Sequence, residues 1–208
     1  RFAWPRLSAW LIVIFLLGCS PGEEVRVFMI GDSTMAPKGE HQRPKTGWGE
    51  VFDTFFEPHV TLLNHARNGR STKSFIDEGR WQQVRDSLQE GDYVLIQFGH
   101  NDEKKYKPMV YASPGDYYNN LALFVRQTRQ KGAIPVLMTP VVRRRFDAEG
   151  SFYGTHGLYP GQVRQLAERE EVYLVDMHLR SLQEVVRLGP EPSKSLFLWL
   201  EEGEEENY

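Results

Sequence analysis

Short apolar runs recur along the chain and are separated by segments of helical spacing. The runs are rich in strand-forming residues, are bounded by turn or polar residues, and cover residues 25–30, 60–64, 93–98, 134–139 and 172–175. Apolar side chains recur with the spacing of a helix face in residues 48–56, 81–88, 117–129 and 163–170. The pattern predicts five β-strands with helices between them.

The alternation of strands and helices also predicts how the strands pair. Strands that are joined through helices run parallel, and a parallel sheet is covered on both faces. Right-handed crossovers then give an α/β fold, a three-layer α/β/α sandwich with a central parallel five-stranded sheet. In such a sheet functional residues gather beyond the carboxyl ends of the strands. The residues after each strand are therefore the first place to look for chemistry.

Composition limits the number of domains and the class of partner. The 208 residues are 40% hydrophobic and 12% aromatic, which is enough for one sizeable core and one domain. Two of the 25 basic residues lie in the first eighteen positions and five of the 28 acidic residues in the last eight, so the rest is neutral. A neutral body gives no electrostatic reason to expect nucleic acid. The single cysteine excludes an intramolecular disulfide and a Cys-rich zinc site.

The first eighteen residues have the features of an export signal. Two arginines precede a wholly apolar run from 9 to 17, which is too short to span a bilayer. The run ends in Leu16-Leu17-Gly18-Cys19, which resembles the bacterial lipobox. We expect residues 1–18 to be removed, Cys19 to carry a lipid anchor to a bacterial membrane on the periplasmic side or cell surface, and 19–24 to be a tether before a domain at 25–208. The alternative is an ordinary buried cysteine in a helix.

Three of the predicted strand ends carry residues suited to acyl chemistry. Ser33 follows the first strand on a tight turn at the start of a helix, where it offers a hydroxyl nucleophile and a free N–H. Gly69 follows the second strand and allows close backbone approach to a ligand. Asn101 follows the third strand and offers a neutral amide donor for an oxyanion. Taken singly, each also reads as a helix cap or turn residue.

Together these residues resemble a known enzyme family. Gly31-Asp32-Ser33, Gly69 and Gly99-His100-Asn101-Asp102 match, in order and spacing, the first three blocks of the SGNH (GDSL-type) hydrolases. The fuller strings at 31–35, 68–81, 92–104, 139–146 and 155–157 resemble the rhamnogalacturonan acetylesterase branch of that superfamily. The resemblance implies the flavodoxin-like SGNH hydrolase fold and covers nearly everything from Val25 to Tyr208.

The resemblance also implies a mechanism. Ser33 would be the nucleophile, and the oxyanion hole would consist of the Ser33 N–H, the Gly69 N–H and the side-chain amide of Asn101. The reaction would be hydrolysis of an acetyl ester on a sugar of an acetylated polysaccharide, such as rhamnogalacturonan in pectin. No metal and no organic cofactor is expected. Other acylated glycans, xylan among them, are alternative substrates.

The base of this family lies in a fourth block, Asp-x-x-His, which these 208 residues do not contain. Residues 199–208 resemble the stretch that leads into that block, so we expect the catalytic Asp and His beyond Tyr208 and expect the chain to be nearly inactive by itself. Asp176-x-His178 has the wrong spacing and is expected to begin a helix. His156 is the remaining alternative as a base, although the family places none there.

Other readings of the same residues belong to different functional classes. A catalytically silent glycan-binding lipoprotein would keep the fold and the cleft without the base. A phosphate-accepting signalling domain would also place Asp32 after the first strand of a parallel sheet, but the export signal, Gly69 and Asn101 disfavour it. The arginines at 143–145 could pair with the carboxylates of an acidic polysaccharide, or belong to a solvated loop.

Overall fold

A computed structural model describes residues 24–199 of the chain. The expected signal segment, Cys19, all of the tether except its last residue, and the acidic residues from 200 onward lie outside the described residues. Among the helices of the described part, none combines the length and apolar character needed to cross a membrane.

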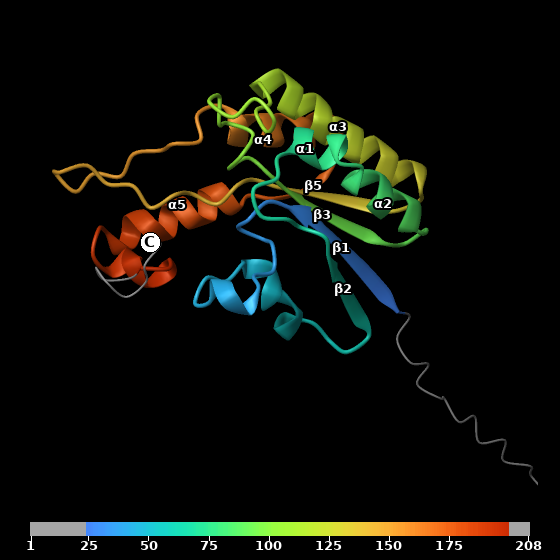
Figure 1. Cartoon of the computed structure of the whole chain (residues 1–208), viewed down its shortest axis with the longest axis horizontal. Helices are drawn as coiled ribbons and strands as arrows, with labels where there is room; N and C mark the ends of the chain where they lie inside the picture. Colours follow the sequence, from blue (N-terminus) through green and yellow to red (C-terminus); the bar gives the residue numbers. More distant parts are fainter. Residues whose placement is uncertain (1–23, 200–208) are drawn as a thin grey trace, which may run out of the picture.

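A five-stranded parallel sheet forms the centre of the fold (Figure 1). Its strands are β1 (Val25–Gly31), β2 (Val60–Asn64), β3 (Tyr93–Gln97), β4 (Ile134–Met138) and β5 (Tyr173–Val175). They are arranged in the order β2-β1-β3-β4-β5. Each predicted strand is therefore present, and the α/β class with a parallel sheet is confirmed.

Four α-helices of the described residues cover one face of the sheet. They are α1 (Thr72–Asp77), α2 (Arg80–Ser87), α3 (Pro114–Gln130) and α4 (Tyr159–Arg169), and Figure 1 shows them gathered on the same side. Between them and the sheet lies the larger core, in which Phe28 and Ile96 of the strands are fully buried with Phe75, Phe124 and Leu166 of the helices. Burying such large apolar side chains is the main favourable term for this layer.

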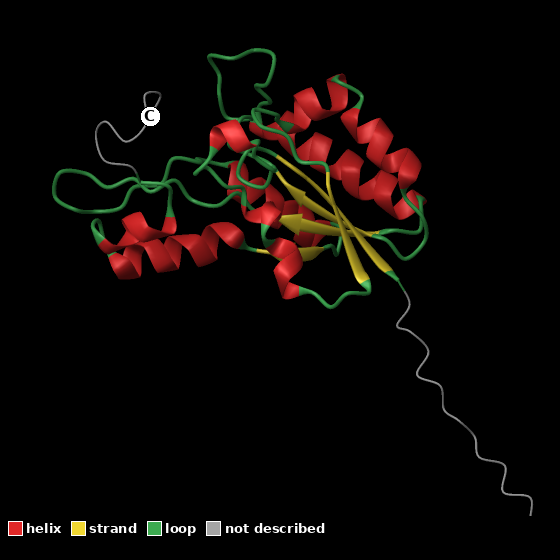
Figure 2. Cartoon of the chain, turned by 60° about the horizontal axis from the view of Figure 1, so that its bottom comes forward, coloured by secondary structure: helices red, strands yellow, loops and turns green. Residues whose placement is uncertain are grey.

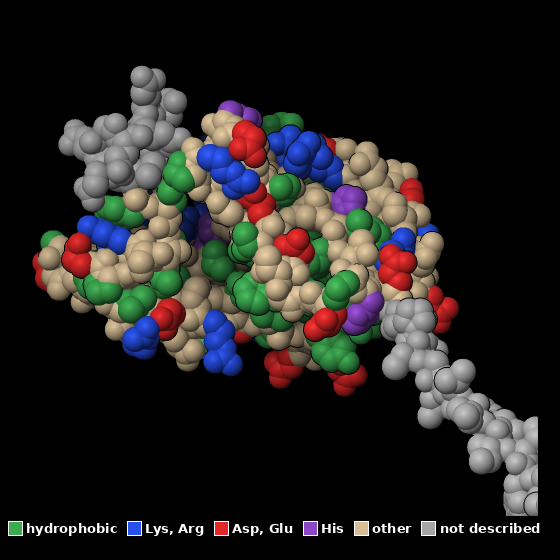
Figure 3. Space-filling view, turned by 90° about the horizontal axis from the view of Figure 1, so that it is seen from below, with side chains coloured by type: hydrophobic (Ala, Val, Ile, Leu, Met, Phe, Trp, Pro, Cys, Tyr) green, Lys and Arg blue, Asp and Glu red, His purple; other side chains and the backbone are tan. Residues whose placement is uncertain are grey.

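Short 3₁₀ helices and one end of α5 (Met177–Leu188) lie on the opposite face (Figure 2). The smaller core there contains Met29, Met35 and Met138, with Phe52 and Met177 packed against it. An apolar cavity of about 600 Å³ lies over this face and is lined by residues of β1, β3, β4 and the 3₁₀ segment. Figure 3, which looks onto this side, shows hydrophobic side chains near the centre and charged ones around them.

The helix expected at residues 48–56 is not an α-helix. Two 3₁₀ helices, Trp48–Glu50 and Phe52–Phe55, occupy the segment. The Trp48 N–H donates to Thr34 O in the turn after β1, at 2.9 Å, which ties the segment to that turn. A Cβ added at Gly47 would lie only 2.1 Å from the Ala36 carbonyl oxygen, so the close approach requires glycine there. The apolar spacing is therefore correct, but tertiary contacts select a tighter helix.

The strand order determines where a ligand can bind. The chain goes outward from β1 to β2, then returns past β1 to β3 and continues to β5. The loops after β1 and β3 therefore diverge at the carboxyl ends of these strands, which is the switch point where open α/β sheets form their clefts. Ser33 and Asn101 follow these two strands.

Candidate active site

The turn after β1 is organised around a buried carboxylate. Asp32 is fully buried, and its Oδ1 accepts hydrogen bonds from the backbone N–H and the hydroxyl of Thr34, both at 2.9 Å. Its Oδ2 accepts from the His100 N–H at 3.3 Å and lies 3.5 Å from the Nδ1 atom of His100. Burial raises the pKa of Asp32, but His100 and Thr34 together lower it by more, so the carboxylate form is favoured. Asp32 therefore joins the β1 turn to the loop after β3.

Ser33 lies on this turn but not at the start of a regular helix, which corrects that part of the prediction. One helical turn forms, because the Ala36 N–H donates to Asp32 O at 3.0 Å, and it ends at Pro37. Within the described residues the hydroxyl and the backbone N–H of Ser33 make no hydrogen bond. Both groups are thus available to a bound ligand.

Gly69 lies in the loop between β2 and α1. Its φ of +76° is in the left-handed region, which favours glycine over residues with a Cβ. A Cβ added there would have no heavy atom within 4 Å, so the position borders open space. Its backbone N–H makes no hydrogen bond within the described part of the chain. The geometry thus matches the expectation of a free donor at a place that a ligand can reach.

Asn101 is buried and its amide is held at both ends. Its Nδ2 donates to the Arg70 carbonyl oxygen at 2.9 Å, and its Oδ1 accepts from the Lys104 ammonium at 2.7 Å. These two partners fix which end of the amide is nitrogen, because a carbonyl can only accept and an ammonium can only donate. One of the two Nδ2 hydrogens is engaged by Arg70, which leaves the other for a ligand.

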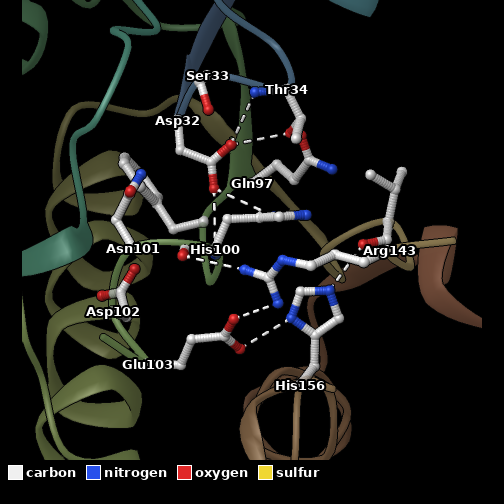
Figure 4. Close-up of polar contacts among 12 residues, drawn as sticks. Asp32, Ser33, Thr34, Gln97, His100, Asn101, Asp102, Glu103, Arg143 and His156 are labelled. Atoms are coloured by element: carbon white, nitrogen blue, oxygen red, sulfur yellow. Dashed lines mark hydrogen bonds and ion pairs between the residues drawn. The ribbon is translucent and has the colours of Figure 1, made fainter. Parts of the chain in front are cut away.

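Asp102 anchors the start of α1 and does not face the turn that carries Ser33 (Figure 4). Its Oδ1 accepts from the Thr72 N–H at 2.9 Å and from the Thr72 hydroxyl at 2.5 Å, whereas its Oδ2 is buried without a hydrogen bond. Burial raises the pKa of Asp102 to about 7, although the bonds from Thr72 act in the opposite direction. Asp102 therefore orients Thr72 at the start of α1.

We predict that Asp102 makes the stability of the fold depend on pH. Below about pH 4 the carboxyl is protonated in the folded and the unfolded chain, and above about pH 7 it is ionised in both. Between these values only the unfolded chain releases the proton, so the free energy of unfolding falls as pH rises, by up to roughly 1.4 kcal/mol per pH unit. Denaturant titrations of Asp102→Asn should show a flatter profile in this window.

The matched control for this prediction is Asp53→Asn, because Asp53 is exposed in a 3₁₀ helix away from α1. This variant should keep the pH profile of the parent. Identical slopes in the parent and in Asp102→Asn between pH 4 and 7 would contradict the assignment.

A partly buried ionic cluster supports the loop after β3. Figure 4 shows Glu103 between Arg143 and His156: its Oε1 pairs with the guanidinium of Arg143, and its Oε2 lies 3.0 Å from the Nδ1 atom of His156. Arg143 also donates to the carbonyl oxygen of His100 at 3.2 Å. The cluster thus fixes the backbone on both sides of Asn101.

His156 does not serve as the base in this arrangement. Its ring is 2% exposed, and its Nε2 lies 2.8 Å from the Val141 carbonyl oxygen while its Nδ1 faces Glu103. Both ring nitrogens therefore already face oxygen atoms of the protein, and neither points to the Ser33 turn as a hydrogen-bond partner. His178 begins α5 behind the N-cap Asp176, as expected. Within the described residues no histidine contacts the Ser33 hydroxyl.

Sequence reasoning missed three charged side chains and misjudged two others. Lys38, Glu103 and Lys104 each contact the predicted site or its supporting loop. Arg143 is held by Glu103 and is not available as a carboxylate-binding group. Arg144 donates to Ser193 and Pro190 and packs over the Trp199 ring. A cation soon after Ser33 is visible in the sequence, but no periodicity indicates where its side chain lies.

The chain is similar in sequence to a known family and to curated proteins of that kind. The GDSL-like Lipase/Acylhydrolase family model matches residues 29–197. Rhamnogalacturonan acetylesterase RhgT of Bacillus subtilis (strain 168) is 41% identical over 184 residues, which are 88% of this chain and 78% of the relative. The probable rhamnogalacturonan acetylesterase YesY of the same organism is 34% identical over 173 residues, which are 83% of this chain and 79% of that protein.

A solved structure shows the same fold. The crystal structure of the protein YxiM from Bacillus subtilis superimposes with a TM-score of 0.74 at 27% sequence identity. The superposition covers 84% of this chain and 49% of that one, so the chain spans about half the length of this structural neighbour.

Proposed function

The chain belongs to the GDSL-like lipase/acylhydrolase family, and from that premise we propose that it is a carbohydrate O-acetylesterase whose nucleophile is Ser33. The single observation that carries the proposal is the meeting of unengaged groups at the carboxyl ends of β1, β2 and β3. These groups are the Ser33 hydroxyl and N–H, the Gly69 N–H and the second Nδ2 hydrogen of Asn101.

These groups have the chemistry of acyl transfer. In the proposed reaction the Ser33 oxygen attacks the carbonyl carbon of a sugar acetyl ester and passes its proton to a base. The three donors bind the oxyanion of the tetrahedral intermediate, which collapses as the sugar oxygen leaves and takes up the proton. Water then gives one proton to the base as it attacks the acetyl-serine, and the base passes that proton to the Ser33 oxygen as the acetyl group leaves as acetic acid. No step requires an oxidant, a reductant or a co-substrate other than water.

The base is the one part of this mechanism without a counterpart among the described residues. His156 is committed to Glu103 and Val141, and His100 faces Asp32. The expectation that an Asp-x-x-His block beyond Tyr208 supplies the base stays a prediction. Activity is therefore best measured on a chain that includes such a block, with the 208-residue chain assayed beside it.

We propose acetylated rhamnogalacturonan as the substrate, because two similar relatives carry that activity in their names. The test is acetate release from acetylated rhamnogalacturonan and from acetylated xylan at matched acetyl content. We expect a higher kcat/KM on rhamnogalacturonan. A higher kcat/KM on xylan would replace the substrate, and release from neither would favour a silent glycan-binding protein of the same fold.

A further inference from the structure

Two lysines flank the predicted oxyanion hole from different loops. Lys38 follows β1, and its ammonium donates to the Ser33 carbonyl oxygen and, at 2.6 Å, to the side-chain oxygen of Asn68, the neighbour of Gly69. Lys104 follows β3, and its ammonium donates to Asn101 Oδ1 at 2.7 Å. Each predicted donor residue therefore has a lysine bound to it or to its neighbour in the chain.

Neither lysine is directly paired with a carboxylate among the described residues, although Glu50 and Asp32 attract Lys38 from farther away, and Asp32 and Glu103 attract Lys104. Within the described residues no ion pair joins Lys38 or Lys104 to an acidic side chain. The acidic groups nearby are committed elsewhere: Asp32 accepts from Thr34, Glu50 pairs with Arg43 at 3.0 Å, and Glu103 pairs with Arg143 and His156. The site therefore has an excess of positive charge although the chain as a whole is acidic.

Each ammonium also keeps a donor for a ligand. An ammonium has three N–H groups, and the contacts of Lys38 use two of them while those of Lys104 use one. Both side chains are only partly buried. Burial lowers the pKa of Lys104, and the positive charges of Lys107 and Arg143 lower it further, while the carboxylates of Asp32 and Glu103 act in the opposite direction. A bound anion would relieve the repulsion from the two cations. Arg67, exposed in the loop of Gly69, adds a further cation without a side-chain partner among the described residues.

We propose that Lys38 and Lys104 form a carboxylate subsite that holds the uronate of an acidic polysaccharide next to the acetyl ester. The inference rests on the proposed function, because the subsite is defined by its position beside Ser33. It assigns to these lysines the role that the sequence suggested for Arg143 and Arg144, which the fold uses internally. A neutral glycan could accept hydrogen bonds from the ammonium groups through its hydroxyls but would offer them no negative charge.

Direct binding tests this without any need for catalysis. The probe is a rhamnogalacturonan oligosaccharide free of acetyl groups, compared with the same oligosaccharide after reduction of its uronate carboxyls to alcohols. By isothermal titration calorimetry we expect the parent chain to bind the acidic form roughly tenfold more tightly, which corresponds to about 1.4 kcal/mol. Added salt should reduce that preference, since charge pairs near the surface are screened.

Four variants make the test specific. Lys38→Met and Lys104→Met should each lower the preference by about threefold or more, as expected when a charge-assisted contact is lost. Lys131→Met should retain the preference, because Lys131 is exposed at the end of α3, at the opposite edge of the sheet. Lys38→Arg keeps the charge and should retain most of the preference, which separates loss of charge from loss of folding.

The results of the oligosaccharide-binding test can be distinguished from those of the acetate-release test. Equal affinity of the parent for the two oligosaccharides, or binding of neither, would overturn the carboxylate subsite even if acetate release is observed. A preference that survives in both methionine variants would also overturn it. Absence of acetate release by a chain that includes the Asp-x-x-His block, together with a lysine-dependent preference for the acidic form, would instead refute the esterase and keep the subsite.

Discussion

Replacing Ser33 by alanine is expected to lower acetate release by about 10⁴-fold or more in a chain that carries both the serine and a base, without changing the fold. The reason is that alanine has no nucleophilic oxygen, so no acetyl-enzyme can form and only the positioned donors remain to stabilise attack by water. Ser33 has no side-chain hydrogen bond within residues 24–199, so the substitution removes no contact that supports the structure. The measurement is the rate of acetate release together with a thermal unfolding curve.

Ser87→Ala is a matched control for this experiment. Ser87 ends α2, is exposed, and its hydroxyl donates only to the carbonyl of Gln83 in its own helix. The control should keep the parent rate. Comparable acetate release by Ser33→Ala and the parent would remove Ser33 from the reaction, and the role of Gly69 and Asn101 as oxyanion donors would then lose its basis.

The second large effect is expected for Asn101→Ala, which should lower kcat by about 10²- to 10³-fold. The side chain is preorganised: Arg70 O and the Lys104 ammonium hold the amide so that its second N–H is free, and no rearrangement is needed when the oxyanion forms. Because that charge exists only in the intermediate and its transition states, kcat should fall much more than KM rises.

The variant Asn101→Asp tests whether the side-chain N–H of Asn101 is needed, or only the shape of the side chain. The aspartate has nearly the same shape and can still accept from Lys104, but it has no N–H to donate and adds a negative charge where the oxyanion would form. We expect it to be at least as inactive as Asn101→Ala, whereas Asn119→Ala on the exposed face of α3 should behave as the parent. A fall in stability without a selective fall in kcat would show a purely structural role for Asn101.

The local pattern of the sequence predicted the elements and the place of the site. Strands and helices could be read from their different periods, and the structure has each strand within one residue of its predicted bounds. The position of Ser33 and Asn101 at one edge followed from the parallel sheet, since the carboxyl ends of parallel strands meet there. Ser71, the N-cap of α1, likewise acts over a few residues, because its side chain accepts from the Ser74 N–H of the helix that directly follows.

The local sequence pattern does not predict contacts between segments that are distant in the chain. Residues 48–56 have helical spacing, yet they form 3₁₀ turns because Gly47 packs on Ala36 and the Trp48 N–H bonds to Thr34. The turn that carries Ser33 does not extend into a helix, because Pro37 ends it.

The sequence by itself determined which residues lie at the strand ends, because periodicity and turn chemistry act over a few residues. Only the tertiary structure decided which charges are free. Arg143 looked available to a substrate but is paired with Glu103, forty residues earlier in the chain, whereas Lys38 and Lys104 remain without a carboxylate partner among residues 24–199. Ion pairing depends on distances of a few ångströms between side chains from different loops, and the packing of those loops sets these distances.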